Sequence, residues 1–176
     1  MLYVLAFPRL ADADIERVEA FRLKHEPQRA QLVGAHVTLV FGLPNEAEGA
    51  LLQRTAAVAC EAAEFPVLLD RAEMHDGRDG ERHLFLMVGQ GADRLIGLYR
   101  GLNAGLTPPS GMPAFQPHVT VAASSSRTAI EAAHSDVARL HLPIAARIDA
   151  LVVAVLADST LTQLARLKLR AADGEQ

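Results

Sequence analysis

The sequence His36-Val37-Thr38-Leu39 occurs a second time, with one conservative change, as His118-Val119-Thr120-Val121. Each copy alternates polar and apolar residues, which is the pattern of a β-strand with one buried face. The apolar residues can pack into a core, while the histidine and the threonine project together from the opposite face. We therefore expect two strands that each present an imidazole beside a hydroxyl group.

The segments around the two motifs alternate between the periodicities of strands and helices. The first half of the chain predicts strands at 2–7, 36–41 and 65–73, and helices at 13–24 and 46–62. The second half predicts strands at 81–88, 118–122 and 147–156, helices from about 93 to 106 and around 130–140, and a final hairpin strand at 159–170. Two Asp-Gly turn signals favour a hairpin between the strands at 65–73 and 81–88.

One constant offset relates the two halves. The motifs are separated by 118 − 36 = 82 residues. Adding this offset to each of the five elements predicted in the first half places it on an element of the same kind in the second half. A fixed period of this kind indicates an internal duplication. We expect a single domain over residues 1–176, with repeats at approximately 1–73 and 83–155.

The composition is typical of a globular protein and excludes several classes of partner. Half of the residues are hydrophobic and 22% are charged, which argues against disorder. The net charge of −4 disfavours a long nucleic-acid duplex as a ligand, because proteins that bind duplexes usually have a basic face. No apolar run is long enough to span a membrane, and residues 2–7 read as a strand and not as a signal peptide. We expect a monomeric, cytoplasmic protein without a membrane partner.

Two histidine/threonine pairs brought face to face suit a reaction that removes one proton and delivers another. An imidazole with a pKa near 6.5 is present in both protonation states close to neutral pH. In displacement at a phosphodiester, a neutral histidine accepts the proton of the attacking water or hydroxyl, and a protonated histidine donates to the departing oxygen. The threonine hydroxyls can donate hydrogen bonds to the non-bridging oxygens. This scheme needs no metal and no other cofactor.

The two motifs and the order of elements around them resemble the two-histidine (2H) phosphoesterase superfamily, in particular its bacterial 2′,5′ RNA ligase and cyclic phosphodiesterase-like members. The resemblance covers essentially the whole chain. It implies an α+β fold of two pseudo-symmetric lobes, each an antiparallel sheet with flanking helices, and an active cleft between the lobes. It also implies that His36, Thr38, His118 and Thr120 are the catalytic residues.

Five further residues are candidates for contacting a substrate. His83 and Phe85 alternate on one face of the strand at 81–88, and Phe7 belongs to the strand that the offset pairs with it; an aromatic ring there could stack on a base. Arg127 begins a predicted helix close to the second motif and could approach a phosphate, and Arg82 could line the rim of the cleft. A core role for the aromatic residues and a solvated surface role for the arginines remain open.

The two motifs favour a metal-independent phosphodiesterase, and the resemblance implies that its substrate is a 2′,3′-cyclic nucleotide, an RNA-terminal cyclic phosphate or a 2′,5′ linkage. Ligation through the same histidines is the reverse reaction. A non-catalytic module that binds a nucleotide or an RNA end is an alternative on the same fold. A metal-dependent hydrolase would need carboxylate ligands that no motif supplies. The pseudo-symmetry leaves the acid and the base unassigned between His36 and His118.

Overall fold

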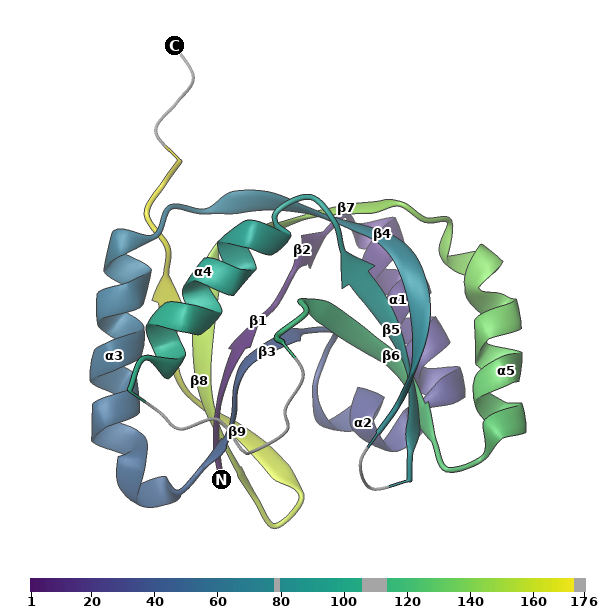
Figure 1. Cartoon of the computed structure of the whole chain (residues 1–176), viewed down its shortest axis with the longest axis horizontal. Coiled ribbons are helices and arrows are strands. Elements are labelled where there is room, and N and C mark those ends of the chain that lie inside the picture. Colours follow the sequence, from purple (N-terminus) through teal and green to yellow (C-terminus); the bar gives the residue numbers. More distant parts are fainter. Residues whose placement is uncertain (78–79, 106–113, 173–176) are drawn as a thin grey trace.

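Two antiparallel sheets with packed helices form the protein, as a computed structural model shows for residues 1–77, 80–105 and 114–172 (Figure 1). The first sheet has the strand order β3 (Val37–Leu43), β1 (Leu2–Ala6), β8 (Ala150–Ala157) and β9 (Thr160–Lys168). The second has the order β2 (Arg9–Leu10), β7 (Ile144–Ile148), β4 (Phe65–Asp76), β5 (Arg82–Val88) and β6 (His118–Ser124). The α+β class and the two antiparallel sheets are confirmed.

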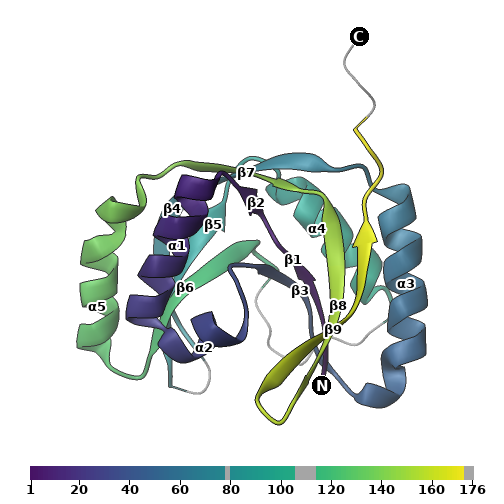
Figure 2. The same ribbon diagram turned by 180° about the vertical axis from the view of Figure 1, so that it is seen from behind.

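The helices connect the strands of each half of the chain. They are α1 (Asp12–His25), α2 (Pro27–Leu32), α3 (Glu48–Glu61), α4 (Ala92–Asn103) and α5 (Arg127–Asp136), with short 3-10 turns η1 (Asn45–Ala47) and η2 (Val137–Leu140). Helices α3 and α4 pack against the first sheet, and α1 and α5 against the second (Figures 1 and 2). None of the helices in the described ranges is long and apolar enough to cross a membrane.

Each sheet combines strands from both halves of the chain. The first sheet takes β1 and β3 from the first half and β8 from the second, whereas the second sheet takes β5 and β6 from the second half and β4 from the first. The helices cross in the same way: α1 packs on β6, and α4 packs on β3. The predicted hairpin of β4 and β5 is confirmed. The boundaries of the two sequence repeats stay a prediction. Because each sheet includes a strand from the other half of the chain, neither half forms a complete sheet by itself.

The alternation of the two motifs places their apolar residues in the core. Val37 and Leu39 are 1% and 0% exposed, and Val119 and Val121 are both 0% exposed. Strands β3 and β6 are the edge strands of their sheets, and these two edges lie side by side in the middle of the molecule (Figure 1). The polar faces of the two motifs are therefore brought to one place.

The predicted interior strand at 147–156 is confirmed from Ala150 onward, where β8 lies between β1 and β9, but its first residues belong to β7, because Asp149 separates two strands of different sheets. Strand β7 pairs with β4, and β8 pairs with β1. The Asp149 carboxylate accepts hydrogen bonds from Arg9 at 3.1 Å and from Arg166 at 2.9 Å. Both strands are apolar, so hydrophobicity alone does not reveal the change of sheet between them.

Smaller differences concern the helices. Ile15 is 41% exposed although it lies three residues before Val18, and the buried residues of that helix are Val18, Phe21 and Arg22. The short elements α2 and β2 were not expected from the sequence. The end of the predicted helix at 106, residues 107–113 of the loop after it, and residues 78–79 of the turn after β4 lie outside the described residues.

Candidate active site

A cavity of about 370 Å³ lies where β3 meets β6. Its wall includes all four residues of the two motif pairs: His36, Thr38, His118 and Thr120. The other lining residues come from β1, α1, α2, β3, β5 and the β8–β9 hairpin: Tyr3, Leu5, Arg22, Glu26, Arg29, Leu32, Val33, Phe41, His83, Phe85, Leu156 and Leu161. The volume falls in the range of small-molecule sites, about 300–1,000 Å³.

The two imidazoles are held in the same way. Nδ1 of His36 lies 2.8 Å from the carbonyl oxygen of Gly34, and Nδ1 of His118 lies 2.7 Å from that of Gln116. A carbonyl oxygen only accepts, so Nδ1 carries the proton and donates in each case. The neutral rings are therefore Nδ1–H tautomers. Within the described part of the chain, Nε2 of each ring has no hydrogen-bond partner and is free to accept or deliver a proton.

Burial lowers the pKa of both histidines below the ordinary value of 6.5. The hydrogen bonds to Gly34 and Gln116 oppose this shift because they favour the protonated rings. Positive charge nearby adds to it: Arg22 and His118 act on His36, and His75 and His83 act on His118. The free protein therefore favours two neutral imidazoles at neutral pH, and a bound anion would favour protonation of one of them.

The two threonines lie beside the imidazoles on their own strands. Thr38 pairs with Leu5 of β1, and Thr120 pairs with Phe85 of β5. In the described part of the chain, neither hydroxyl has a hydrogen-bond partner, and both side chains are half-buried. Each hydroxyl can therefore donate to an oxygen atom of a ligand in the cavity.

Aromatic rings contact the two histidines differently. The ring of Phe85 stacks on that of His118, with 3.7 Å between centroids and 20° between planes. The ring of Phe7 contacts His36 at 5.9 Å and is tilted by 51°. Phe85 and His83 are part of the cavity wall, as their shared face on β5 predicts. Phe7 is not part of the cavity wall, although its ring contacts His36, and stacking of Phe7 on a base stays a prediction.

Arg82 and Arg127 do not line this cavity. Both belong to a separate depression of about 250 Å³ beside α5. Arg82 pairs with Asp76 at 3.1 Å, and Arg127 pairs with Glu131 at 2.7 Å. Both guanidinium groups therefore lie outside the cavity in this structure, and a contact with the substrate phosphate stays a prediction.

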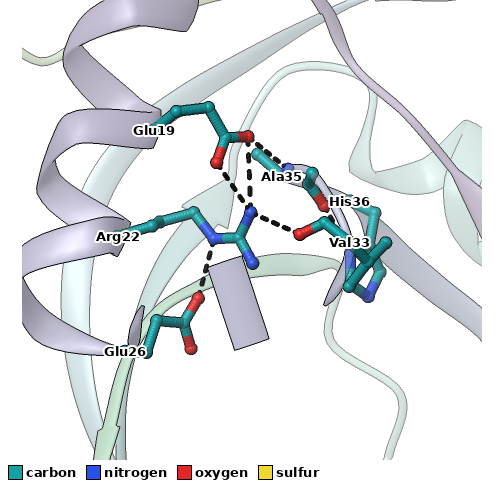
Figure 3. Close-up of polar contacts among 7 residues, drawn as sticks. Glu19, Arg22, Glu26, Val33, Ala35 and His36 are labelled. Atoms are coloured by element: carbon teal, nitrogen blue, oxygen red, sulfur yellow. Dashed lines mark hydrogen bonds and ion pairs between the residues drawn. The ribbon is translucent and has the colours of Figure 1, made fainter. Parts of the chain in front are cut away.

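Three charged residues of the cavity wall were missed by the sequence reasoning: Arg22, Glu26 and Arg29. Arg22 is 2% exposed and donates from Nε to Oε1 of Glu26 at 2.7 Å (Figure 3). The sequence contains a signal for the burial of Arg22, since Arg22 follows Val18 and Phe21 at the spacing of one helical face. Both guanidinium groups have carboxylate partners, Arg22 in Glu19 and Glu26, and Arg29 in Glu81 at 2.6 Å.

No group of three His, Cys, Asp or Glu residues in the described ranges is placed to hold a metal ion. A depression of about 400 Å³ between α3 and α4 contains no histidine. Its arginines donate to main-chain oxygens, Arg94 to Ala63 and Arg170 to Glu61. Two smaller depressions contain one histidine each, His75 and His25, whereas the cavity between β3 and β6 contains three, including both motif histidines.

Solved structures of other proteins share the fold. E. coli LigT is 22% identical, with a TM-score of 0.59 and 96% of each chain covered. TT0787 of Thermus thermophilus is 19% identical, with a TM-score of 0.64 and coverage of 97% of this chain and 98% of that one. Kluyveromyces marxianus Usb1 is 14% identical, with a TM-score of 0.60 and coverage of 93% and 97%. No curated protein sequence matches the chain.

The family comparison agrees with the two motifs and with the fold. The family model described as the 2′-5′ RNA ligase superfamily matches residues 8–160, which include both His-x-Thr motifs. This match confirms the resemblance to the two-histidine phosphoesterases that the motifs indicate. The chain belongs to the 2′-5′ RNA ligase superfamily.

Proposed function

We propose that the protein is a metal-independent phosphodiesterase that opens a 2′,3′-cyclic phosphate on a nucleotide or an RNA end, or cleaves a 2′,5′ linkage. One observation carries the proposal: His36 and His118 line a single cavity, each with Nδ1 held by a main-chain oxygen and Nε2 free. Together with the two threonines, they are the catalytic residues in this proposal.

The reaction follows from these positions. The Nε2 atom of one neutral histidine accepts a proton from water as the water oxygen attacks phosphorus, and the protonated Nε2 of the other donates to the ribose oxygen as its bond to phosphorus breaks. The Thr38 and Thr120 hydroxyls donate to the non-bridging oxygens, where negative charge grows. The substrate phosphate supplies the negative charge that raises the pKa of the donating histidine, which burial lowers in the free protein.

The character of the cavity supports a nucleotide. Its wall combines Arg22 and Arg29 with apolar side chains of the first sheet, including Phe41, which is 48% exposed. A ring of this kind can stack on a base. Structures of the related fold have been solved with nucleotides: E. coli LigT with NADP+, 3′-AMP and ATP, and Kluyveromyces marxianus Usb1 with uridine monophosphate.

A substrate panel tests the proposal. The purified protein is assayed on the four 2′,3′-cyclic nucleotides, on 2′,5′- and 3′,5′-linked dinucleotides, and on short RNAs that end in a cyclic phosphate, with the phosphate position resolved in each product. The 3′,5′-linked dinucleotides are the matched control. Turnover that survives excess EDTA is expected. Activity that is lost on chelation and restored by a divalent ion would instead indicate a metal-dependent hydrolase, and nucleotide binding without turnover on any substrate would indicate a binding module.

A further inference from the structure

The loop before His36 is held from both sides by side chains of α1 (Figure 3). The main-chain N–H of Ala35 donates to Oε1 of Glu19 at 2.6 Å. The carbonyl oxygen of Val33 accepts from Nη1 of Arg22 at 2.9 Å. Between these two anchored residues lies Gly34, whose carbonyl oxygen accepts from Nδ1 of His36. The anchors therefore fix the peptide that sets the tautomer and orientation of the His36 ring.

The two anchors are joined to each other and to a buried carboxylate. Nη1 of Arg22 donates to both oxygens of Glu19, at 3.0 and 3.3 Å, and Nε donates to Glu26. The side chains of Arg22 and Glu26 are each 2% exposed, whereas that of Glu19 is 30% exposed. A charge network at this depth is costly unless its members are paired and geometrically fixed. Because burying these charges costs free energy, we ask whether the network also has a role in positioning His36.

The other motif lacks this arrangement. At the offset of 82 residues, Glu19, Arg22 and Glu26 correspond to Gly101, Ala104 and Pro108, none of which carries a charge. The loop before His118 is held instead by a main-chain hydrogen bond from the Val88 N–H to the Pro117 oxygen at 3.0 Å. Stacking of Phe115 on Tyr99, with 4.1 Å between centroids, adds support nearby. Among the residues that the structure describes, His36 is therefore tied to a buried charge network and His118 is not.

We propose that Glu19, Arg22 and Glu26 form a positioning clamp for His36, which fixes its Nδ1–H tautomer and keeps its Nε2 aimed into the cavity. The clamp makes the two histidines inequivalent. Side chains of a buried charge network hold the loop before His36, whereas a main-chain hydrogen bond holds the loop before His118. That the clamp serves catalysis rests on the proposed function, whereas the positioning itself does not.

Glu19 offers the sharpest variants because it is the least buried member of the clamp. Glu19→Ala removes the acceptor of the Ala35 N–H, whereas Glu19→Gln keeps one acceptor oxygen. We expect kcat of Glu19→Ala to fall by about tenfold to a hundredfold, the scale of a small misplacement of a reacting group, with little change in KM and with substantial recovery in Glu19→Gln. Glu131→Ala, which breaks the exposed pair with Arg127 on α5, is the matched control and should leave both constants unchanged.

Nitrogen NMR of the two imidazoles gives a readout that does not depend on turnover. In the wild type, both rings should show the Nδ1–H tautomer. In Glu19→Ala, the His36 ring should populate a second tautomer and change its titration midpoint, while His118 keeps its signals; Glu19→Gln should restore His36.

Two results would overturn the clamp: His36 signals and kcat that are unchanged in folded Glu19→Ala, or equal changes in His36 and His118, which would indicate general loosening. The proposed function fails differently, through absence of turnover in a wild-type protein whose His36 still shows the clamped tautomer.

Discussion

Replacing either histidine with asparagine removes the reactive nitrogen and keeps the structural one. The asparagine amide nitrogen lies near the position of Nδ1 and can still donate to the carbonyl oxygen of Gly34 or Gln116, but nothing replaces Nε2. General acid or base catalysis contributes about 10²–10⁴ in rate, or roughly 3–5.5 kcal/mol of transition-state stabilisation. We expect kcat/KM of His36→Asn and of His118→Asn to fall by that factor on the best substrate of the panel.

The effect on folding should be far smaller. Both rings are half-buried on the cavity wall, so water can reach the gap that each leaves. At most one hydrogen bond weakens, at about 0.5–1.5 kcal/mol, and His118 also loses its stacking on Phe85, which is worth about 0.5–1.5 kcal/mol. For a chain of this length, the melting temperature should fall by a few degrees, at about 2–4 °C per kcal/mol.

The assay is steady-state hydrolysis with product analysis, alongside thermal melting of each variant. The double variant should be little slower than the worse single variant, because residues that act together in one displacement are strongly non-additive. His134→Asn, on the exposed surface of α5, is the control and should behave as the wild type. Near wild-type turnover in both folded single variants would refute the two-histidine mechanism, whatever the fold.

Further predictions concern hydroxyls, pH and the arginines. Thr38→Val and Thr120→Val should each lower kcat/KM by about tenfold to a hundredfold with little change in melting temperature, because a hydrogen bond to a charged group is worth about 1.5–3 kcal/mol; unchanged kinetics would exclude phosphate contact. The pH profile of kcat/KM should be bell-shaped and centred below 6.5, because burial lowers the pKa of both imidazoles; a maximum well above pH 7 would contradict this. Because the pKa values of the histidines are lower in the folded protein, the unfolded chain binds more protons below pH 6.5. The free energy of unfolding, measured by chemical denaturation, should therefore fall as the pH drops from 6.5 through the pKa values of the folded protein. The decrease should be smaller in His36→Asn. Arg82→Gln and Arg127→Gln should leave kcat and KM unchanged, since both side chains are paired outside the cavity.

Much of the fold was readable because its signals are local. The His-x-Thr strands, their buried valines and the β4–β5 hairpin depend on alternation and on turn residues within a few positions of each other. The change of sheet at Asp149 was not readable, because both flanking strands are apolar and the partner of each lies far away in the chain. The surroundings of Arg82 and Arg127 were not readable for a similar reason: which carboxylate pairs with an exposed arginine depends on its three-dimensional neighbours.

The sequence by itself determined that two similar strands would each present a histidine and a threonine on one face, since side-chain alternation is a local property of an extended chain. Only the tertiary structure decided how those faces meet. Exchange of β4 and β8 between the halves makes β3 and β6 the adjoining edges of two sheets, and the packing of α1 on β6 brings Arg22 and Glu26 into the wall of the same cavity as His36 and His118. Burial in that shared cavity, and not the residue types alone, lowers the pKa of both imidazoles and makes their surroundings unequal.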